Sequence, residues 1–200
     1  MGQWLHHCAD HPYAYAVLIH AVAMAGSTLS DVIGIVPHDV CAVAVDCRAY
    51  GLSDAETKSF ATTQFADDIV VVFDAVDRDR AVIAEWSIGG CWTRALASDY
   101  PDRTAGLVLI DALAWGGPDV RATWTAWADT AVTAGLKIVL PLQRDRWSSD
   151  AFCVARPDRV EDIEAFSQRS VSLCKQLRHA GPRGPARGVD RAACRRGGVG

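Results

Sequence analysis

The segment Glu85–Gly90, with the sequence EWSIGG, is the part of this chain whose residue types and spacing best fit catalysis. It follows the apolar run Ala81–Ala84, which predicts a buried strand, and it opens the stretch Gly89–Tyr100, which predicts a helix. A serine on such a strand-to-helix turn presents its hydroxyl for nucleophilic attack, and small residues after it let the strand and the helix close on each other. The start of the helix favours the negative charge that develops on an attacked carbonyl oxygen. The sequence therefore predicts Ser87 as a candidate nucleophile.

The elements that must position Ser87 are short apolar runs separated by helical stretches. Runs without alternation are typical of strands buried on both faces, and here they are Tyr15–Ile19, Ala42–Val45, Ala81–Ala84 and Gly106–Ile110. Apolar residues recur at helical spacing between Phe60 and Val76. Strands that alternate with helices predict an α/β fold with a mostly parallel sheet, whose carboxyl edge carries the chemistry. The polar residues expected at this edge are His20, Asp46, Ser87 and Asp111.

Three segments carry a further signal because they occur together and in a fixed order. They are Val17–Ala21 (VLIHA), Asp46–Asp54 (DCRAYGLSD) and Trp86–Gly90 (WSIGG), the last followed by Tyr100–Arg103 and Leu107–Asp111. The first is similar to a strand that ends in His-Gly. The second keeps five of the six fixed positions of a D-x-R-G-x-G-x-S-D loop. On these residues the chain resembles the α/β-hydrolase superfamily, in particular its branch of esterases, haloperoxidase-like enzymes and carbon–carbon hydrolases.

The resemblance implies a role for several residues. Ser87 would be the nucleophile of a serine hydrolase that acts on a small ester or related acyl substrate through an acyl-enzyme. The backbone N–H groups of Val22 and Ile88 would form the oxyanion hole. In the family the catalytic acid follows the next core strand and the catalytic histidine follows the last one. Asp111 and His179 are the weak candidates that this sequence offers for those two positions.

The sequence departs from the family pattern in ways that leave a second reading open. Glu85 stands at the first glycine of the turn, where it brings bulk and a carboxylate close to a developing oxyanion, and Ala21 replaces the glycine of His-Gly. The strands expected to carry the acid and the histidine have no counterpart after Asp111. The alternative is therefore a truncated or non-catalytic relative that at most binds a small ligand.

The chain divides into three parts on composition. We expect an α/β-hydrolase core at 1–115, equivalent to strands three to six of that fold, a helical cap segment at 116–178, and a Gly/Arg-rich tail without fixed structure at 179–200. In the cap segment, Leu136–Leu140 reads equally as a strand or as part of a helix and loop. Three tryptophans are expected to pack the cap onto the core, with the lining of an apolar pocket as the alternative: Trp115, Trp124 and Trp127.

The net charge and the length of the apolar runs limit the classes of partner that we expect. The net charge of −4 gives no support to nucleic-acid binding, and the longest apolar run, Ala14–Ala25, is too short to span a bilayer. Without a basic leader before that run, we expect a cytoplasmic protein that binds a small-molecule substrate. The sequence indicates no oligomeric state.

Cofactors, metals and disulfides are not expected. The segment His6–His11 approaches a histidine-rich metal motif, but its place at the N-terminus favours loop residues before the first strand. The seven scattered cysteines are expected to be small buried side chains. We expect His20 to shape its loop by hydrogen bonding, and Asp46 and Arg48 to fix the loop that follows the second run.

Overall fold

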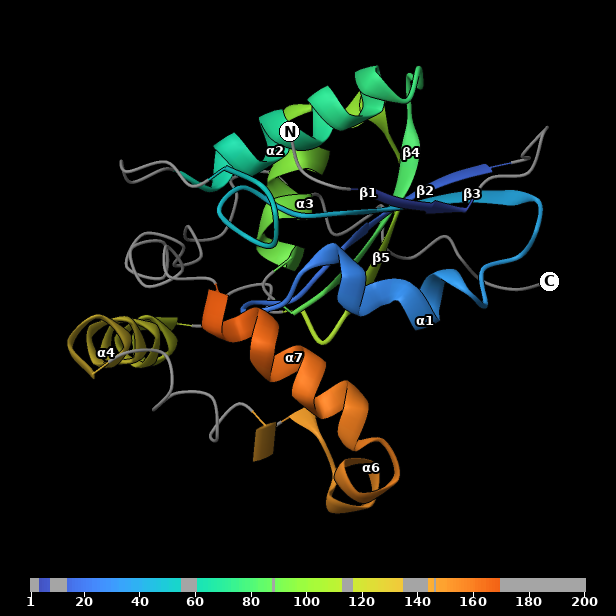
Figure 1. Cartoon of the computed structure of the whole chain (residues 1–200). Helices are drawn as coiled ribbons and strands as arrows, with labels where there is room; N and C mark the ends of the chain where they lie inside the picture. Colours follow the sequence, from blue (N-terminus) through green and yellow to red (C-terminus); the bar gives the residue numbers. More distant parts are fainter. Residues whose placement is uncertain are drawn as a thin grey trace, which may run out of the picture.

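The computed structural model describes residues 4–7, 14–54, 61–87, 89–112, 117–134, 144–145 and 147–169. Within these residues one five-stranded sheet has the strand order β1-β3-β2-β4-β5 (Figure 1). Its strands are β1 (Trp4–His7), β2 (Ala14–Ile19), β3 (Val40–Val45), β4 (Ala81–Trp86) and β5 (Thr104–Ile110). The strands β2 to β5 run parallel, and β1 pairs antiparallel with β3. The expected α/β architecture with a mostly parallel sheet is confirmed.

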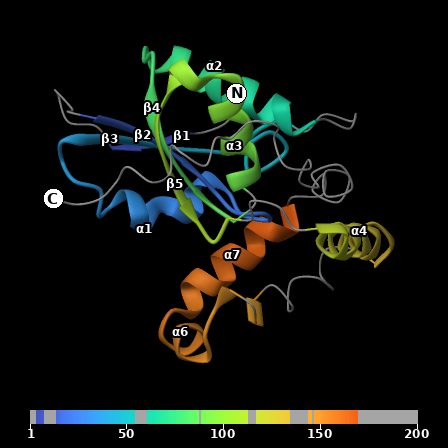
Figure 2. The ribbon, with the colours of Figure 1, turned by 180° about the vertical axis from the view of Figure 1, so that it is seen from behind.

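Helices cover both faces of the sheet. The helices α2 and α3 lie on one face and the short α1 lies on the other (Figures 1 and 2). The helical elements are η1 (Gly26–Leu29), α1 (Ser30–Ile33), α2 (Thr62–Ala75), α3 (Gly89–Asp99), η2 (Pro101–Arg103), α4 (Gly117–Ala134), α6 (Asp150–Ala155) and α7 (Pro157–Arg169). The helix predicted between the runs Ala42–Val45 and Ala81–Ala84 is present as α2, and the helix predicted after Ser87 is present as α3.

The two faces of the sheet are built from different side chains, because successive residues of a strand point to opposite faces. Val17 and Ile19 of β2 join the main core with α2 and α3, whereas Leu18 packs with α1. On the α1 side the neighbouring strands present alanines, including Ala42 and Ala44 of β3. Small side chains there let the short η1–α1 segment approach the sheet closely.

Two expectations about the N-terminal part are wrong. His6 and His7 belong to strand β1, which pairs with β3 over four residues, and are not loop residues before the first strand. A four-residue edge strand is defined by its backbone hydrogen bonds to a neighbour, and a run of that length gives little periodic signal. Cys41 in β3 is disulfide-bonded rather than a free thiol, whereas Cys47 is a buried free thiol as expected.

The connections of the parallel strands change direction between β2 and β4. From β2 the chain steps to β3 on one side, then crosses back over β2 to β4 and continues outward to β5. The loops after β2 and β4 therefore diverge to opposite faces at the carboxyl edge, and such a switch point is where open α/β sheets bind ligands. Ile19 and Glu85 are register partners beside this point.

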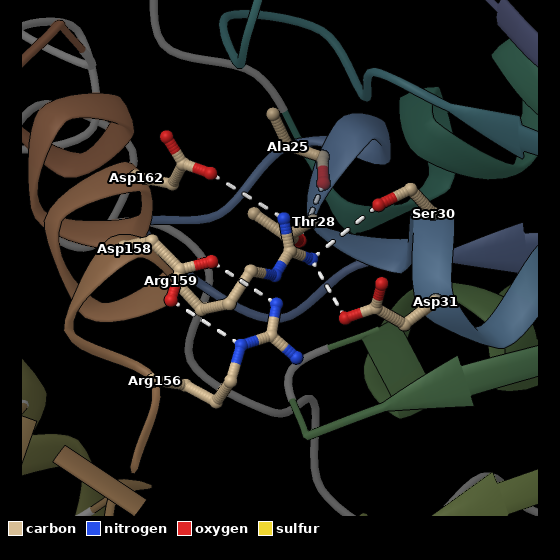
Figure 3. Close-up of polar contacts among 8 residues, drawn as sticks. All are labelled: Ala25, Thr28, Ser30, Asp31, Arg156, Asp158, Arg159 and Asp162. Carbon is tan, nitrogen blue, oxygen red and sulfur yellow. Dashed lines mark hydrogen bonds and ion pairs between the residues drawn. The ribbon is translucent and has the colours of Figure 1, made fainter. Parts of the chain in front are cut away.

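Helix α7 is tied to α1 by a polar contact centred on Arg159 (Figure 3). The guanidinium of Arg159 lies 3.1 Å from a carboxylate oxygen of Asp31 and donates to Ser30 Oγ at 3.3 Å. It also pairs with Asp162 one turn further along α7, at 3.4 Å. Figure 3 shows that a separate pair, Arg156 with Asp158, lies beside it at the start of α7. The partly buried Arg159 and the exposed carboxylate of Asp31 therefore join α7 to α1, which is distant from it in the sequence.

The expected helical segment contains α4, α6 and α7, but its division from the core as a separate unit stays a prediction. Leu136–Leu140 and the tail at 179–200 lie outside the described residues.

Among the helices that the structure describes, none combines the length and the apolar character needed to cross a bilayer. In the edge strand β5 of the described sheet, three large apolar side chains are exposed: Val108, Leu109 and Ile110.

Candidate active site

Ser87 lies on the turn between the end of β4 and the start of α3, at the carboxyl edge of the sheet. Its φ of +64° is a left-handed conformation that residues other than glycine rarely adopt. The Ser87 N–H donates to the carbonyl of Ile110 at 2.9 Å, and the Gly90 N–H donates to the Ser87 carbonyl at 3.2 Å. Backbone strain of this kind costs about 1–3 kcal/mol and clusters at functional sites. The predicted position of Ser87 is confirmed, and its role as nucleophile stays a prediction.

Gly90 allows the turn to close. A Cβ placed on Gly90 would lie 2.5 Å from the Cβ of Ala112 and 2.7 Å from Oε1 of Glu85. Real Cβ atoms essentially never come so close to other heavy atoms, so a larger residue would push the first turn of α3 away from β4 and β5. The expectation of small residues after Ser87 is therefore met by steric necessity at this position.

Glu85 is an ionisable side chain in the core. The side chain is only 1% exposed, and neither carboxylate oxygen has a hydrogen-bond partner of good geometry among the described residues. Burial raises the pKa of Glu85 to about 7; the backbone N–H groups of Gly90 and Ile110 act against this rise, and the charge of Asp111 adds to it. At neutral pH the carboxyl group is therefore partly protonated, which is unusual for glutamate.

His20 ends β2 and is held by the backbone on both ring nitrogens. Its Nδ1 donates to the carbonyl of Ala21 at 2.8 Å, and its Nε2 accepts the N–H of Cys47 at 3.2 Å. The ring is fully buried, and burial lowers the pKa of His20, so the neutral form is favoured. The expectation that His20 shapes its loop is confirmed. Since both nitrogens are engaged, this ring is not available as a base.

The loop after His20 makes a tight turn through Val22, the predicted oxyanion-hole donor. The Met24 N–H donates to the carbonyl of Ala21 at 3.3 Å, and Ala23 has a φ of +58°. Val22 itself is buried. Ile88, the other predicted donor, lies outside the described residues, so the pairing of the two N–H groups stays a prediction.

Asp46 joins two loops at the edge of the site. One carboxylate oxygen accepts the N–H of Gly26 at 2.7 Å and the other accepts the N–H of Leu52 at 2.9 Å. Gly51 between them has a φ of +53°, and a Cβ there would overlap the Asp46 carboxylate. The expectation that Asp46 fixes its loop is confirmed.

Arg48 fixes the same loop from outside. Its guanidinium makes two bonds of 2.6 Å to the carboxylate of Asp68 on α2. A bidentate pair of this geometry ties the loop after β3 to the middle of α2. The expected structural role of Arg48 is therefore also confirmed.

A buried aromatic layer beneath this edge was not anticipated from the sequence. Trp92 of α3 stacks on Phe65 of α2 with ring centroids 4.0 Å apart, and Tyr50 lies 4.8 Å from the ring of His20. Trp92 is also 5.9 Å from Tyr50. These rings link the loops after β2 and β3 to α2 and α3. Helical spacing could place Phe65 in the core, but no sequence signal paired it with Trp92.

The structure describes only some of the remaining residues that the sequence predicted for the site. Asp111 directly follows β5, is exposed and has a φ of +51°. His179 lies outside the described residues, as do Trp115 and the side chain of Trp124. Trp127 of α4 is half-buried.

A tryptophan that was not anticipated from the sequence lies close to the turn that carries Ser87. Trp147 packs against Trp86, the residue before Ser87, with ring centroids 6.5 Å apart. Trp147 also borders the main core. Trp147, which precedes α6 in the chain, therefore lies beside the residue that comes just before the candidate nucleophile.

Comparison with known proteins agrees with this geometry. The family model described as alpha/beta hydrolase fold matches residues 27–152, which is more than half of the chain. The chain belongs to the α/β-hydrolase fold family. This member is similar to 3-oxoadipate enol-lactonase 2 of Acinetobacter baylyi, with 23% identity over 143 residues, covering 69% of the chain and 53% of that protein. It is also similar to 2-(acetamidomethylene)succinate hydrolase of Mesorhizobium japonicum, with 33% identity over 69 residues, covering 34% of the chain and 25% of that protein.

Solved structures show the same fold. The crystal structure of the enol-lactonase from Burkholderia xenovorans superposes with a TM-score of 0.75 at 22% identity, covering 90% of this α/β hydrolase and 71% of that chain. The matched region is about half the length of the enol-lactonase from Acinetobacter baylyi and a quarter of the hydrolase from Mesorhizobium japonicum. These likenesses establish the fold and a relationship to hydrolases.

Proposed function

We propose that this α/β hydrolase is a serine hydrolase that cleaves a small ester or related acyl substrate. The observation that carries the proposal is the left-handed backbone of Ser87 on the turn between β4 and α3. A residue other than glycine is held there at an energetic cost, and a serine on a strand-to-helix turn of this kind presents its hydroxyl for nucleophilic attack. The hydrolases among its relatives support the same reaction class.

In the proposed reaction, Ser87 Oγ attacks the carbonyl carbon and the carbonyl oxygen becomes an oxyanion. The backbone N–H groups of Val22 and Ile88, together with the start of α3, stabilise that charge. Collapse of the intermediate breaks the bond to the alcohol, which leaves with a proton, and water then hydrolyses the acyl-enzyme. His179 is the first residue to test as the base.

A second candidate function is a non-catalytic relative that binds a small ligand. The observation that favours it is Glu85, which places a buried carboxyl group at the start of α3 where the oxyanion must be stabilised. In this reading the fold and the switch-point site persist, whereas the chemistry at Ser87 is lost.

Labelling with a fluorophosphonate, combined with hydrolysis of an activated ester, separates the two candidates. A serine hydrolase incorporates one phosphonyl group per chain as Ser87 Oγ displaces fluoride, and the Ser87→Ala variant incorporates none. An intact triad accelerates hydrolysis by about 10⁶, whereas binding and an oxyanion hole alone retain about 10³–10⁴ over water. Equal turnover by the wild-type protein and Ser87→Ala would refute the proposal and favour the ligand-binding relative. A His179→Ala variant that keeps full turnover would show that the base lies elsewhere.

A further inference from the structure

Glu85 occupies a position on β4 where the structure has core side chains. Alternate residues of this strand face α2 and α3, and Ala81, Ile83 and Glu85 are exposed by 2%, 0% and 1%. The first two are apolar, and the third carries a carboxyl group without a hydrogen bond of good geometry among the described residues, although the backbone N–H groups of Gly90 and Ile110 are near enough to lower its pKa. A buried carboxylate without a charged partner carries a large desolvation penalty. The protonated form of Glu85 is therefore favoured over the ionised form.

The carboxyl group of Glu85 lies against the start of α3. Oε1 is 2.7 Å from the position that a Cβ on Gly90 would take, and the N–H of Gly90 is bonded to the carbonyl of Ser87. The first N–H groups of a helix carry a partial positive charge that stabilises an anion nearby. The side chain of Glu85 and the oxyanion of a substrate on Ser87 therefore draw on the same helix start.

Few charges around Glu85 could compensate for its ionisation. Asp111 at the end of β5 is itself acidic and adds to the effect of burial on Glu85. On α3, burial raises the pKa of the Cys91 thiol, Arg94 acts against this rise, and the charge of Glu85 adds to it. At the end of β2, His20 is buried and burial lowers its pKa. No ion pair to Glu85 occurs within the part of the chain that the structure describes.

We propose that the charge state of Glu85 sets how much negative charge the turn at Ser87 can accept. As the neutral acid, Glu85 leaves the start of α3 available to the oxyanion of a bound substrate. When the carboxyl proton is released to solvent, the Glu85 carboxylate itself interacts with the start of α3. Its negative charge then repels the oxyanion of the substrate. The inference rests on the proposed function of Ser87 and makes Glu85 a residue that acts through the turn rather than on the substrate.

The kinetic test follows fluorophosphonate labelling of Ser87 between pH 5.5 and 8.5 in the wild-type protein and in Glu85→Gln, with Ser87→Ala as the blank. Removing one stabilising contact to an oxyanion typically slows an enzyme by about 10²–10³, so an opposing charge in this place is expected to cost at least about tenfold. Glu85→Gln should therefore label at least about tenfold faster than wild type at pH 8.5 and at a similar rate at pH 5.5. Glu161→Gln, which changes an exposed glutamate of α7, should match wild type at both values.

A second readout does not depend on reaction at Ser87. The amide resonances of Ser87 and Gly90, and the side-chain carboxyl ¹³C resonance of Glu85, are followed by NMR over the same pH range. The inference expects a shared titration with a midpoint near the pKa of about 7, and no such transition in the amides of Glu85→Gln.

The outcomes separate the inference from the function on which it rests. Absence of labelling in every variant, with amides that still titrate with Glu85, refutes Ser87 as a nucleophile and supports the charge coupling at the turn. Amides that stay flat across the range overturn the inference. Identical pH profiles of labelling in the wild-type protein and Glu85→Gln overturn it as well.

Discussion

Replacing Glu85 with glutamine removes a buried ionisable group while it keeps the shape of the side chain. The folded protein holds the pKa of Glu85 at about 7, compared with 4.5 for an ordinary glutamate. Between these two values the folded chain binds a proton more strongly than the unfolded chain. The free energy of unfolding of the wild-type protein therefore falls as pH rises through this window, and this contribution levels off above about pH 8.

The magnitude follows from the two pKa values. Complete ionisation of Glu85 lowers the free energy of unfolding by about 3 kcal/mol, and most of this change, about 2–3 kcal/mol, falls between pH 5 and pH 8. No discount for solvent screening is needed, because the side chain is 1% exposed. Glutamine does not ionise, so the stability of Glu85→Gln relative to wild type should rise by this amount over the interval. Other titrating groups are shared by both proteins and cancel in the difference.

The measurement is equilibrium urea denaturation at pH 5 and pH 8, followed by tryptophan fluorescence. In thermal melts the same change should move the difference between the two melting temperatures by roughly 5–10 °C for a chain of this size. Glu161→Gln on α7 serves as the matched control, because that glutamate is exposed. A stability difference between Glu85→Gln and wild type that is the same at both pH values would refute the electrostatic reasoning about this position.

Other substitutions test the packing around the site. Gly90→Ala should lower the free energy of unfolding by about 1–3 kcal/mol through overpacking, whereas Gly106→Ala, whose Cβ meets its nearest atom at 3.8 Å, should be tolerated in the same urea titration. Asp46→Ala removes the acceptor of the Gly26 and Leu52 N–H groups, of which that of Leu52 can turn to water, and it should lower the free energy of unfolding by about 1–3 kcal/mol in chemical denaturation. An unchanged midpoint would contradict the role of Asp46 in the loop. Asp31→Asn should change global stability by less than about 1 kcal/mol but speed hydrogen exchange in α6 and α7, and added salt should reduce the difference from wild type.

The sheet and the position of Ser87 were accessible from the sequence for a simple physical reason. Strands buried on both faces must be apolar throughout, so their runs stand out, and a turn that requires small residues restricts the choice at positions such as Gly90. Parallel strands also place their carboxyl ends at one edge of the sheet. The sequence alone therefore predicts that His20, Asp46, Ser87 and Asp111 lie on one side of the fold.

Short elements at the edge of the sheet could not be predicted from the sequence. Strand β1 has only four residues, and its pairing with β3 depends on backbone hydrogen bonds that leave no periodic pattern. The disulfide at Cys41 likewise depends on the proximity of two cysteines in space, which their spacing along the chain does not specify.

The sequence by itself determined that a carboxylate stands two residues before the candidate nucleophile, because the order of residues in the turn is fixed covalently. Only the tertiary structure decided that the Glu85 side chain is enclosed by β4, β5 and α3 without a hydrogen bond of good geometry among the described residues. The same is true of the rings of His20, Tyr50, Phe65 and Trp92, which come from four separate segments and meet beneath the site. Burial and contact across elements depend on how the layers pack, and the cost of a buried charge appears only once that packing excludes water.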